Sequence, residues 1–347
     1  MQRATRFIDA CYCKPTDCTP VWLMRQAGRY QASYQRIRKK FSFAELCRNP
    51  ELAAQITVNA VNEFEVDAAI IFSDILVPVQ AMGAPVEFSE QGPVLNPPVR
   101  NIFDVQALED IDSREKTPFV AEAIRLAKKA LGGQVPLIGF AGGPITLAAY
   151  LVEGGHSQNF VELKKLLFSD PKTGHVLLGK LSNVISQHLE AQIEAGCDAI
   201  QLFESWGGVL GPDDFREFAL PYHKQIFSEL AECKVPRIFF GTSISTLLEQ
   251  IQQTGADVIG VDWRVALDEA RRRLGPKTAI QGNLDPCCLF MDEESLKNRI
   301  QNMLIQAGTE PGYIFNLGHG VLPSTPPENV RFLVETVHKL SSGKIRA

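Results

Sequence analysis

The sequence predicts an α/β protein folded as a single (β/α)8 barrel, or TIM barrel, over residues 1–347. Two observations predict this fold. Eight short apolar segments recur along the chain, at residues 21–24, 68–72, 137–140, 199–203, 237–240, 258–261, 279–281 and 313–316. Helical patterns lie between them, and no linker-like stretch divides the chain. Alternating strands and helices are typical of parallel sheets, and an open, doubly wound sheet is the structural alternative.

The expected strands are mostly continuous apolar runs; residues 68–72, for example, read Ala-Ala-Ile-Ile-Phe. This pattern is typical of parallel strands that are buried on both faces. Residues 177–194 and 330–340 carry apolar side chains at helical spacing, and the prolines at 326 and 327 stand where a first helical turn tolerates them. Residues 83–100 are rich in turn formers and predict an excursion after the second strand.

The composition excludes several classes of protein. The chain has 347 residues, 45% of them hydrophobic and 22% charged, which suits a globular protein with a large core. A formal net charge of -5 argues against nucleic-acid binding. No apolar run approaches the ~18 residues of a membrane span, and the first residues lack the apolar region of a secretory signal. We therefore expect a cytoplasmic protein whose cysteines are reduced thiols.

Polar or small residues follow each expected strand. They are Arg25, Asp74, Gly142 and Gly143, Ser205, Gly241 and Thr242, Asp262, Gly282 and Asn283, and His319. In a barrel the carboxyl ends of all strands meet at one rim, where catalytic loops lie. The sequence therefore predicts that these residues converge.

Arg25 and Asp74 are the first candidates for chemistry. Arg25 follows a strand directly, and Arg29 lies four residues on, so the two could present a pair of guanidinium forks to carboxylates. The alternative for the basic segment around them is a solvated helix face. A carboxylate at Asp74 offers about four acceptor sites and suits a ligand with several N–H groups. The alternative for Asp74 is a helix N-cap.

The sequence contains few signs of other chemistry. Ser205 lies outside a G-x-S-x-G elbow, and the glycines at 142 and 143 are not part of a P-loop. His319 is the only histidine at the end of an expected strand. Tyr150 lies in the expected helix after the third strand, where a core or surface tyrosine is the usual case. No H-E-x-x-H motif occurs, so we expect no catalytic metal.

Six segments resemble one enzyme family. The segments PVWLMRQAGRY (20–30) and GFAGGPITLAAYLVEGG (139–155) resemble the two signature segments of the uroporphyrinogen decarboxylase family. FSDIL (72–76), QLFES (201–205), QGNLDP (281–286) and NLGHGVLPSTPPENV (316–330) are also similar to segments of that family, in its order. Together they extend over nearly the whole chain.

The resemblance implies a cofactor-free, metal-free carboxy-lyase that works as a homodimer in haem biosynthesis. It implies stepwise loss of CO2 from the four acetate side chains of uroporphyrinogen III, which gives coproporphyrinogen III. By matching motif positions, Asp74, Arg25, Tyr150 and His319 resemble catalytic residues. Substrate-binding residues are similarly implied at Arg25, Gln26, Arg29, Arg38, Asp74, Tyr150, Phe203, Ser205 and His319. The proton donor, the isomer preference and the dimer interface are left open.

Two other functions compete with this interpretation. Corrinoid-linked methyltransferases use a similar barrel with a zinc-bound thiol acceptor, and they need His and Cys ligands near the rim. In this sequence Cys197 precedes its expected strand instead of following it. The second alternative is a tetrapyrrole carrier on an enzyme scaffold that has lost its activity.

Overall fold

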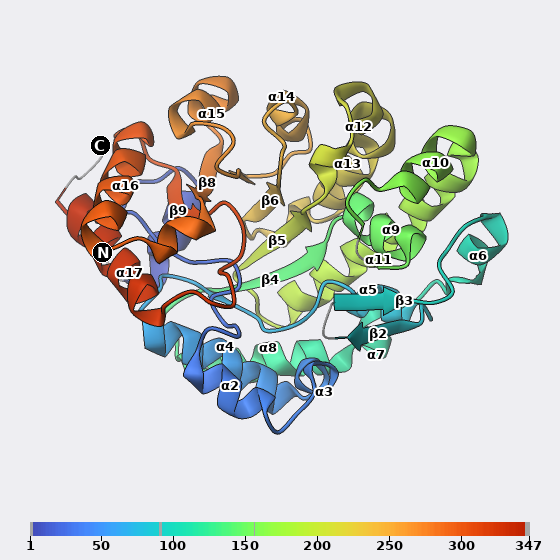
Figure 1. Cartoon of the computed structure of the whole chain (residues 1–347), viewed down its shortest axis with the longest axis horizontal. Coiled ribbons are helices and arrows are strands. Elements are labelled where there is room, and N and C mark those ends of the chain that lie inside the picture. Colours follow the sequence, from blue (N-terminus) through green and yellow to red (C-terminus); the bar gives the residue numbers. More distant parts are fainter. Residues whose placement is uncertain (1–2, 90–91, 156, 344–347) are drawn as a thin grey trace.

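A computed structural model of the protein has a curled sheet of seven parallel strands at its centre (Figure 1). The structure describes residues 3–89, 92–155 and 157–343. The strand order is β1-β4-β5-β6-β7-β8-β9, and every neighbouring pair is parallel. The strands are β1 (Ala69–Ile70), β4 (Leu137–Gly142), β5 (Ala199–Glu204), β6 (Arg237–Gly241), β7 (Val258–Gly260), β8 (Ala279–Leu284) and β9 (Tyr313–Leu317). All their carboxyl ends therefore lie at one edge of the sheet.

Helices connect the strands and surround the sheet (Figure 1). In the first half of the chain they are α1 (Arg3–Cys11), α2 (Ala32–Arg38), α3 (Phe43–Arg48), α4 (Pro50–Phe64), α5 (Val77–Ala81), α6 (Ile102–Ala107), α7 (Ser113–Lys116), α8 (Pro118–Leu131), α9 (Pro144–Glu153) and α10 (Val161–Ser169). In the second half they are α11 (Pro171–Glu194), α12 (Pro212–Phe218), α13 (Leu220–Glu229), α14 (Leu248–Gln252), α15 (Leu267–Leu274), α16 (Glu293–Gln306) and α17 (Pro327–Ser341), with the 3-10 turns η1 (Gly207–Val209), η2 (Ala231–Cys233) and η3 (Pro286–Phe290). The helices predicted at 177–194 and 330–340 are confirmed within α11 and α17. None of the helices in the described ranges has the length and apolar character needed to cross a membrane.

The strands are buried on both faces, as their continuous apolar runs predict. One face packs against the helices, and side chains on the other face meet inside the curl. That inner core contains Phe7, Trp22, Ile138, Ala199, Ile238, Val258, Ala279 and Ile314. Phe7 comes from α1, so this first helix covers one end of the curled sheet. The excursion predicted at 83–100 contains an antiparallel hairpin of β2 (Val86–Ser89) and β3 (Gly92–Leu95).

The segment 21–24, predicted as a strand, makes only one parallel bridge, from Val21 to Phe315 of β9. The reason is that side chains take most of its backbone N–H groups. The N–H of Val21 donates to Asp67 Oδ2 (2.7 Å), that of Leu23 to Gln26 Oε1 (3.1 Å) and that of Met24 to Asn316 Oδ1 (3.1 Å). The described residues therefore form a curled seven-stranded parallel sheet and not a closed barrel of eight strands. The prediction of an α/β fold with a curled parallel sheet is therefore confirmed, whereas the eighth regular strand predicted at 21–24 is not formed.

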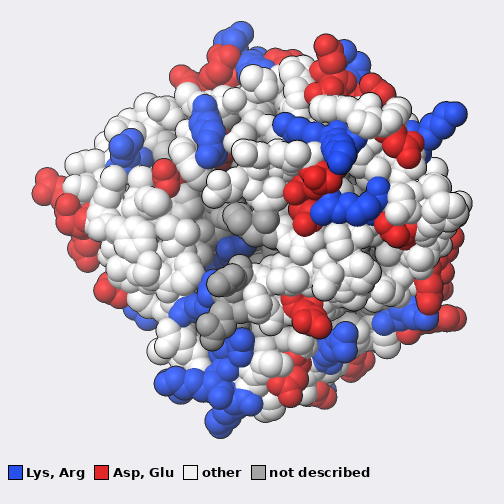
Figure 2. Space-filling view, turned by 45° about the vertical axis from the view of Figure 1, so that its right-hand side comes forward, with Lys and Arg blue, Asp and Glu red and all other residues white. Residues whose placement is uncertain are grey.

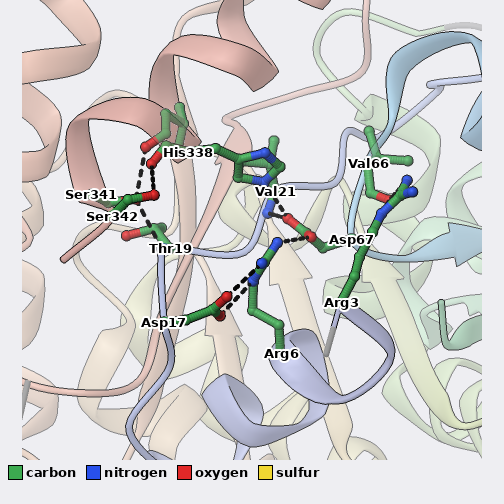
Figure 3. A network of polar contacts seen from close by, with 11 residues as sticks. Arg3, Arg6, Asp17, Thr19, Val21, Val66, Asp67, His338, Ser341 and Ser342 are labelled. Carbon is green, nitrogen blue, oxygen red and sulfur yellow. Dashed lines mark hydrogen bonds and ion pairs between the residues drawn. The ribbon is translucent and has the colours of Figure 1, made fainter. Parts of the chain in front are cut away.

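A buried carboxylate, Asp67, joins the two ends of the curled sheet (Figure 3). Its side chain is 0% exposed and accepts hydrogen bonds from Arg6 Nη1 (2.5 Å) and from the N–H of Val21 (2.7 Å). His338 Nε2, from α17, lies 2.7 Å from Asp67 Oδ2. Arg6 also forms a bidentate pair with Asp17. One carboxylate thus connects α1, the segment after it, the start of β1 and the last helix.

Replacing Asp67 with Ala should lower the free energy of unfolding by about 3 kcal/mol, because Arg6 and His338 would lose a buried acceptor. Denaturant titration of both proteins measures this difference. Asp17→Ala is the matched control, since Asp17 binds the same guanidinium but has a side chain that is 36% exposed. It should cost about 1 kcal/mol or less. Equal losses for the two variants would contradict the assigned role of Asp67.

Candidate active site

Four of the predicted site residues meet at the carboxyl edge of the sheet. The charge of Arg25 acts on the pKa values of Asp74, Tyr150 and His319, and the charge of Asp74 acts on that of Tyr150, so the four side chains lie near one another. Figure 2 shows a face of the molecule that is hollowed near its centre, with Lys and Arg side chains gathered along the lower side of the hollow. These four residues thus bring a carboxylate, a phenol hydroxyl, an imidazole and a guanidinium group together at the edge.

Arg25 lies where the chain turns sharply after the segment 21–24. Its φ is 60°, in the left-handed region that residues with a Cβ seldom adopt. The side chain then extends across Gly320, where a Cβ would overlap Arg25 Cδ and lie 2.6 Å from its Cγ. Glycine at position 320 therefore allows Arg25 to lie beside His319. Arg25 forms no ion pair with any residue that the structure describes, so its guanidinium is free to bind an anion.

Asp74 lies in the loop between β1 and α5. Its Oδ1 accepts a hydrogen bond from the N–H of Leu76 (2.8 Å), which is a local turn of the kind that aspartate commonly makes. Within the described ranges, its Oδ2 has no hydrogen-bond partner. Burial raises the pKa of Asp74 to about 6, although the N–H of Leu76 and the charge of Arg25 act in the opposite direction. The carboxylate is therefore poorly solvated and only partly satisfied.

Tyr150 and His319 are uncharged at neutral pH. Burial raises the pKa of Tyr150 to about 12, and the negative charge of Asp74 adds to the effect. Burial lowers the pKa of His319 to about 4, and repulsion from Arg25 and Arg264 contributes. Both side chains can therefore donate or accept hydrogen bonds, and neither adds a charge to the site.

Phe203 and Ser205 lie at the end of β5. The Phe203 ring packs edge-on against Phe140, with 5.5 Å between ring centroids, and forms an apolar wall. Ser205 follows the strand, is partly exposed, and its carbonyl accepts a hydrogen bond from Thr242 Oγ1 (2.5 Å). The next residue, Trp206, packs on Tyr150 with 4.4 Å between ring centroids. Trp206 thus links the end of β5 to the side chain of Tyr150.

Glu204 supports the helix that carries Tyr150, and the sequence analysis missed this contact. Its side chain is 0% exposed and accepts from the N–H groups of Ile145 (3.1 Å) and Thr146 (2.7 Å). These are free N–H groups in the first turn of α9, so a carboxylate from β5 caps the helix that carries Tyr150. His223 Nε2 lies 2.7 Å from the same carboxylate. The sequence signal for it was a charged residue directly after the apolar run 199–203.

The other three predicted site residues are two exposed arginines, Arg29 and Arg38, and one buried glutamine, Gln26. Arg29 and Arg38 are exposed, and both lie near Tyr34, whose pKa their charges lower against a rise caused by burial. Gln26 is only 1% exposed, and its side chain binds the N–H of Leu23 and the carbonyl of Ala68. Arg29 and Arg38 are thus available to an anionic ligand, whereas Gln26 holds the turn that precedes them.

Comparison with known proteins identifies the family. The family described as "Uroporphyrinogen decarboxylase (URO-D)" matches residues 2–340. The chain belongs to the uroporphyrinogen decarboxylase family. It is 51% identical over 334 residues to "Uroporphyrinogen decarboxylase" of Myxococcus xanthus (strain DK1622), covering 96% of each chain. It is 48% identical over 337 residues to the protein of the same name from Carboxydothermus hydrogenoformans (strain ATCC BAA-161 / DSM 6008 / Z-2901), covering 97% of this chain and 96% of the relative.

The fold is shared more widely than the family. A solved structure described as "methyltransferase from Methanosarcina mazei" superposes with a TM-score of 0.80 at 19% identity, over 98% of this chain and 99% of that one. This similarity concerns the fold alone. A zinc-dependent methyltransferase needs a cluster of metal ligands, and the described part of this chain brings together no group of three or more His, Cys, Asp or Glu side chains that could hold a metal ion.

Replacing Asp74 with Asn should stabilise the protein at pH 8 by about 1–2 kcal/mol, because Asn keeps the acceptor for Leu76 and removes a partly buried charge. The folded pKa of Asp74 is raised from 3.8 to about 6. The folded state therefore binds this proton more tightly, and the wild type loses stability as pH rises from about 4 to 6. Unfolding titrations at pH 4 and pH 8 should give an advantage of Asp74→Asn only at pH 8.

Asp170→Asn is the control of opposite sign. Asp170 caps α11, and its hydrogen bond with Thr173 lowers the pKa of its carboxyl. Its charge thus stabilises the fold at high pH, and Asn should be neutral or unfavourable there. An Asp74→Asn variant that is no more stable than wild type at pH 8 would contradict the burial of the Asp74 charge.

Proposed function

We propose that the protein decarboxylates uroporphyrinogen III to coproporphyrinogen III. In four steps it removes the acetate carboxyl groups as CO2 and leaves four methyl groups. Family membership supports this reaction, and the observation that carries it is the poorly solvated carboxylate of Asp74 beside Arg25. We further propose that Asp74, Arg25, Tyr150 and His319 act in catalysis, in a cytoplasmic homodimer that needs no metal or cofactor.

Asp74 is assigned two roles that need the same ionised state. A porphyrinogen is reduced and pliable, so its four pyrrole N–H groups can tilt toward one acceptor. The free Oδ2 of Asp74 and the remaining lone pair of its Oδ1 can accept these N–H groups. The negative charge also stabilises a cationic pyrrole intermediate, and more strongly as the bound substrate excludes water.

Each decarboxylation exchanges one carboxylate for one proton. A proton adds to the pyrrole α-carbon beside the ring carbon that carries the acetate, which leaves an iminium conjugated to the acetate-bearing carbon. The bond to the carboxylate breaks, CO2 leaves, and the electron pair neutralises the iminium as an exocyclic methylene forms. A second proton adds to the methylene carbon and the first ring proton is lost, so the net change is R–CH2–COO⁻ plus H⁺ to R–CH3 plus CO2.

The arginines are assigned to the substrate's eight carboxylates. Arg25, Arg29 and Arg38 are all exposed and can form bidentate pairs. Tyr150, Ser205 and His319 orient acetate and propionate groups by hydrogen bonds from uncharged side chains, and Phe203 lines the apolar face of the macrocycle. Gln26 acts indirectly, by holding the turn at Arg25.

We also propose that the segment 20–24 takes the eighth position of a (β/α)8 barrel, with residues 1–347 as one domain. Its contacts on both sides support this assignment. The N–H of Phe315 donates to Pro20 O (2.9 Å), and on the other side the N–H of Asp67 donates to Val21 O (2.7 Å). The segment thus lies between β9 and the start of β1.

Asp74→Asn should lower the turnover of uroporphyrinogen at least about 100-fold while the protein stays folded, since the amide lacks the charge that stabilises the cation. Porphyrin fluorescence after oxidation of the products measures the rate. Asp170→Asn removes a carboxylate that caps α11 and has no proposed role in catalysis, so this variant should keep the wild-type rate. A tetrapyrrole carrier would bind uroporphyrinogen without releasing CO2, so an inactive wild type or a fully active Asp74→Asn variant would overturn the proposal.

Oxidised uroporphyrin should not be decarboxylated. Its macrocycle is flat and conjugated, so its nitrogens cannot all be directed at the Asp74 carboxylate. Incubation with substrate labelled in the acetate carboxyl carbons, followed by collection of CO2, compares the reduced and oxidised forms. Comparable CO2 release from the two forms would rule out a single central acceptor.

A further inference from the structure

A fourth cationic group lies at the carboxyl edge of the sheet, after β7. Asp262 is only 1% exposed and accepts from the N–H of Ser243 (2.6 Å) and from the N–H of Arg264 (3.1 Å). Arg264 Nη1 forms an ion pair with Asp262 Oδ2 (2.5 Å). The guanidinium carbon of Arg264 also lies 4.5 Å from the centre of the Trp263 ring. The Arg264 guanidinium is therefore held by the Asp262 carboxylate at one of its nitrogens and by the Trp263 ring on one of its flat faces.

The loop that carries His319 lies between Arg264 and Arg25. On one side, a Cβ at Gly318 would lie 2.8 Å from Trp263 Cε3 and 2.9 Å from Asp262 Cα. On the other side, Gly320 packs directly under the side chain of Arg25. Charges on Arg25 and Arg264 both act on the His319 imidazole. The two guanidinium groups thus flank one loop, which begins at the end of β9.

The Arg264 guanidinium keeps unused donors. Of its side-chain nitrogens, only Nη1 has a hydrogen-bond partner among the residues that the structure describes. The side chain is 46% exposed, so Nε and Nη2 can reach a ligand from solution. A guanidinium that is already held by a carboxylate and an indole loses little conformational freedom when it binds.

We propose that Arg264 binds one peripheral carboxylate of the substrate on the side of His319 away from Arg25. This inference rests on the proposed function. Arg25, Arg29 and Arg38 all come from the segment 25–38 and its helix α2, whereas Arg264 comes from the loop after β7. A macrocycle with carboxylates around its whole periphery needs cationic groups on more than one side, and Arg264 supplies one from a different part of the edge.

The test compares Arg264→Ala, Arg264→Lys and Arg272→Ala with the wild type. Arg272 is a matched control because it lies on the following helix, α15, and forms its ion pair with Glu269. For each protein, KM and kcat are measured with uroporphyrinogen, and its dissociation constant is measured anaerobically by tryptophan quenching. Arg264→Ala should raise KM and the dissociation constant about tenfold with kcat changed less than about twofold. Arg264→Lys should recover part of the loss, and Arg272→Ala should match the wild type.

The outcomes separate this inference from the proposed function. If the wild type is active and Arg264→Ala binds and reacts as the wild type does, the role of Arg264 is overturned and the proposed function stands. Equal weakening by Arg264→Ala and Arg272→Ala would also overturn it, because the effect would then come from net charge alone. A wild type that neither binds nor converts uroporphyrinogen would reject both.

Discussion

The site depends on one carboxylate that the fold leaves partly unsatisfied. Among the described residues, the carboxylate of Asp74 accepts one hydrogen bond, from the N–H of Leu76, and has no ion-pair partner, and burial raises its pKa to about 6. A buried charge without a partner costs stability, and a fold retains it where a ligand supplies the missing contacts. Pyrrole N–H groups, followed by a cationic ring, would complete the environment of Asp74 only during the reaction.

The groups around Asp74 divide into charged and uncharged partners. Tyr150 and His319 are neutral because burial moves their pKa values in opposite directions, up for the phenol and down for the imidazole. The positive charges of the site come from the arginines, whose guanidinium groups can pair with the outer carboxylates of the proposed substrate. The uncharged groups are also firmly held, since Glu204 caps the helix of Tyr150 from the neighbouring strand. The centre of the site thus has one negative charge, and its periphery is positive.

The sequence predicted what depends on local pattern and missed what depends on tertiary contacts. Continuous apolar runs located the strands, and parallel strands then required that Asp74 and His319 lie at the same edge. The same reasoning could not foresee that Glu204, at the end of β5, would cap α9, which follows β4. Nor could it foresee that Arg264 would lie near His319. It also took residues 21–24 for a regular strand, because side-chain acceptors such as Asp67 and Asn316 are not visible in an apolar run.

That departure from regular sheet structure helps to build the site. A strand that continued past Met24 in the β conformation would direct the chain away from the edge. Instead the N–H groups of 21–24 are bound by side chains, and the chain turns at Arg25 with a φ of 60°. A left-handed conformation costs roughly 1–2 kcal/mol at a residue with a Cβ, so the surrounding contacts must enforce it. Asp67, which binds Val21 on one side and α1 and α17 on the other, anchors the start of the segment. The contacts that stabilise the ends of the sheet therefore also direct Arg25 across Gly320 and toward His319.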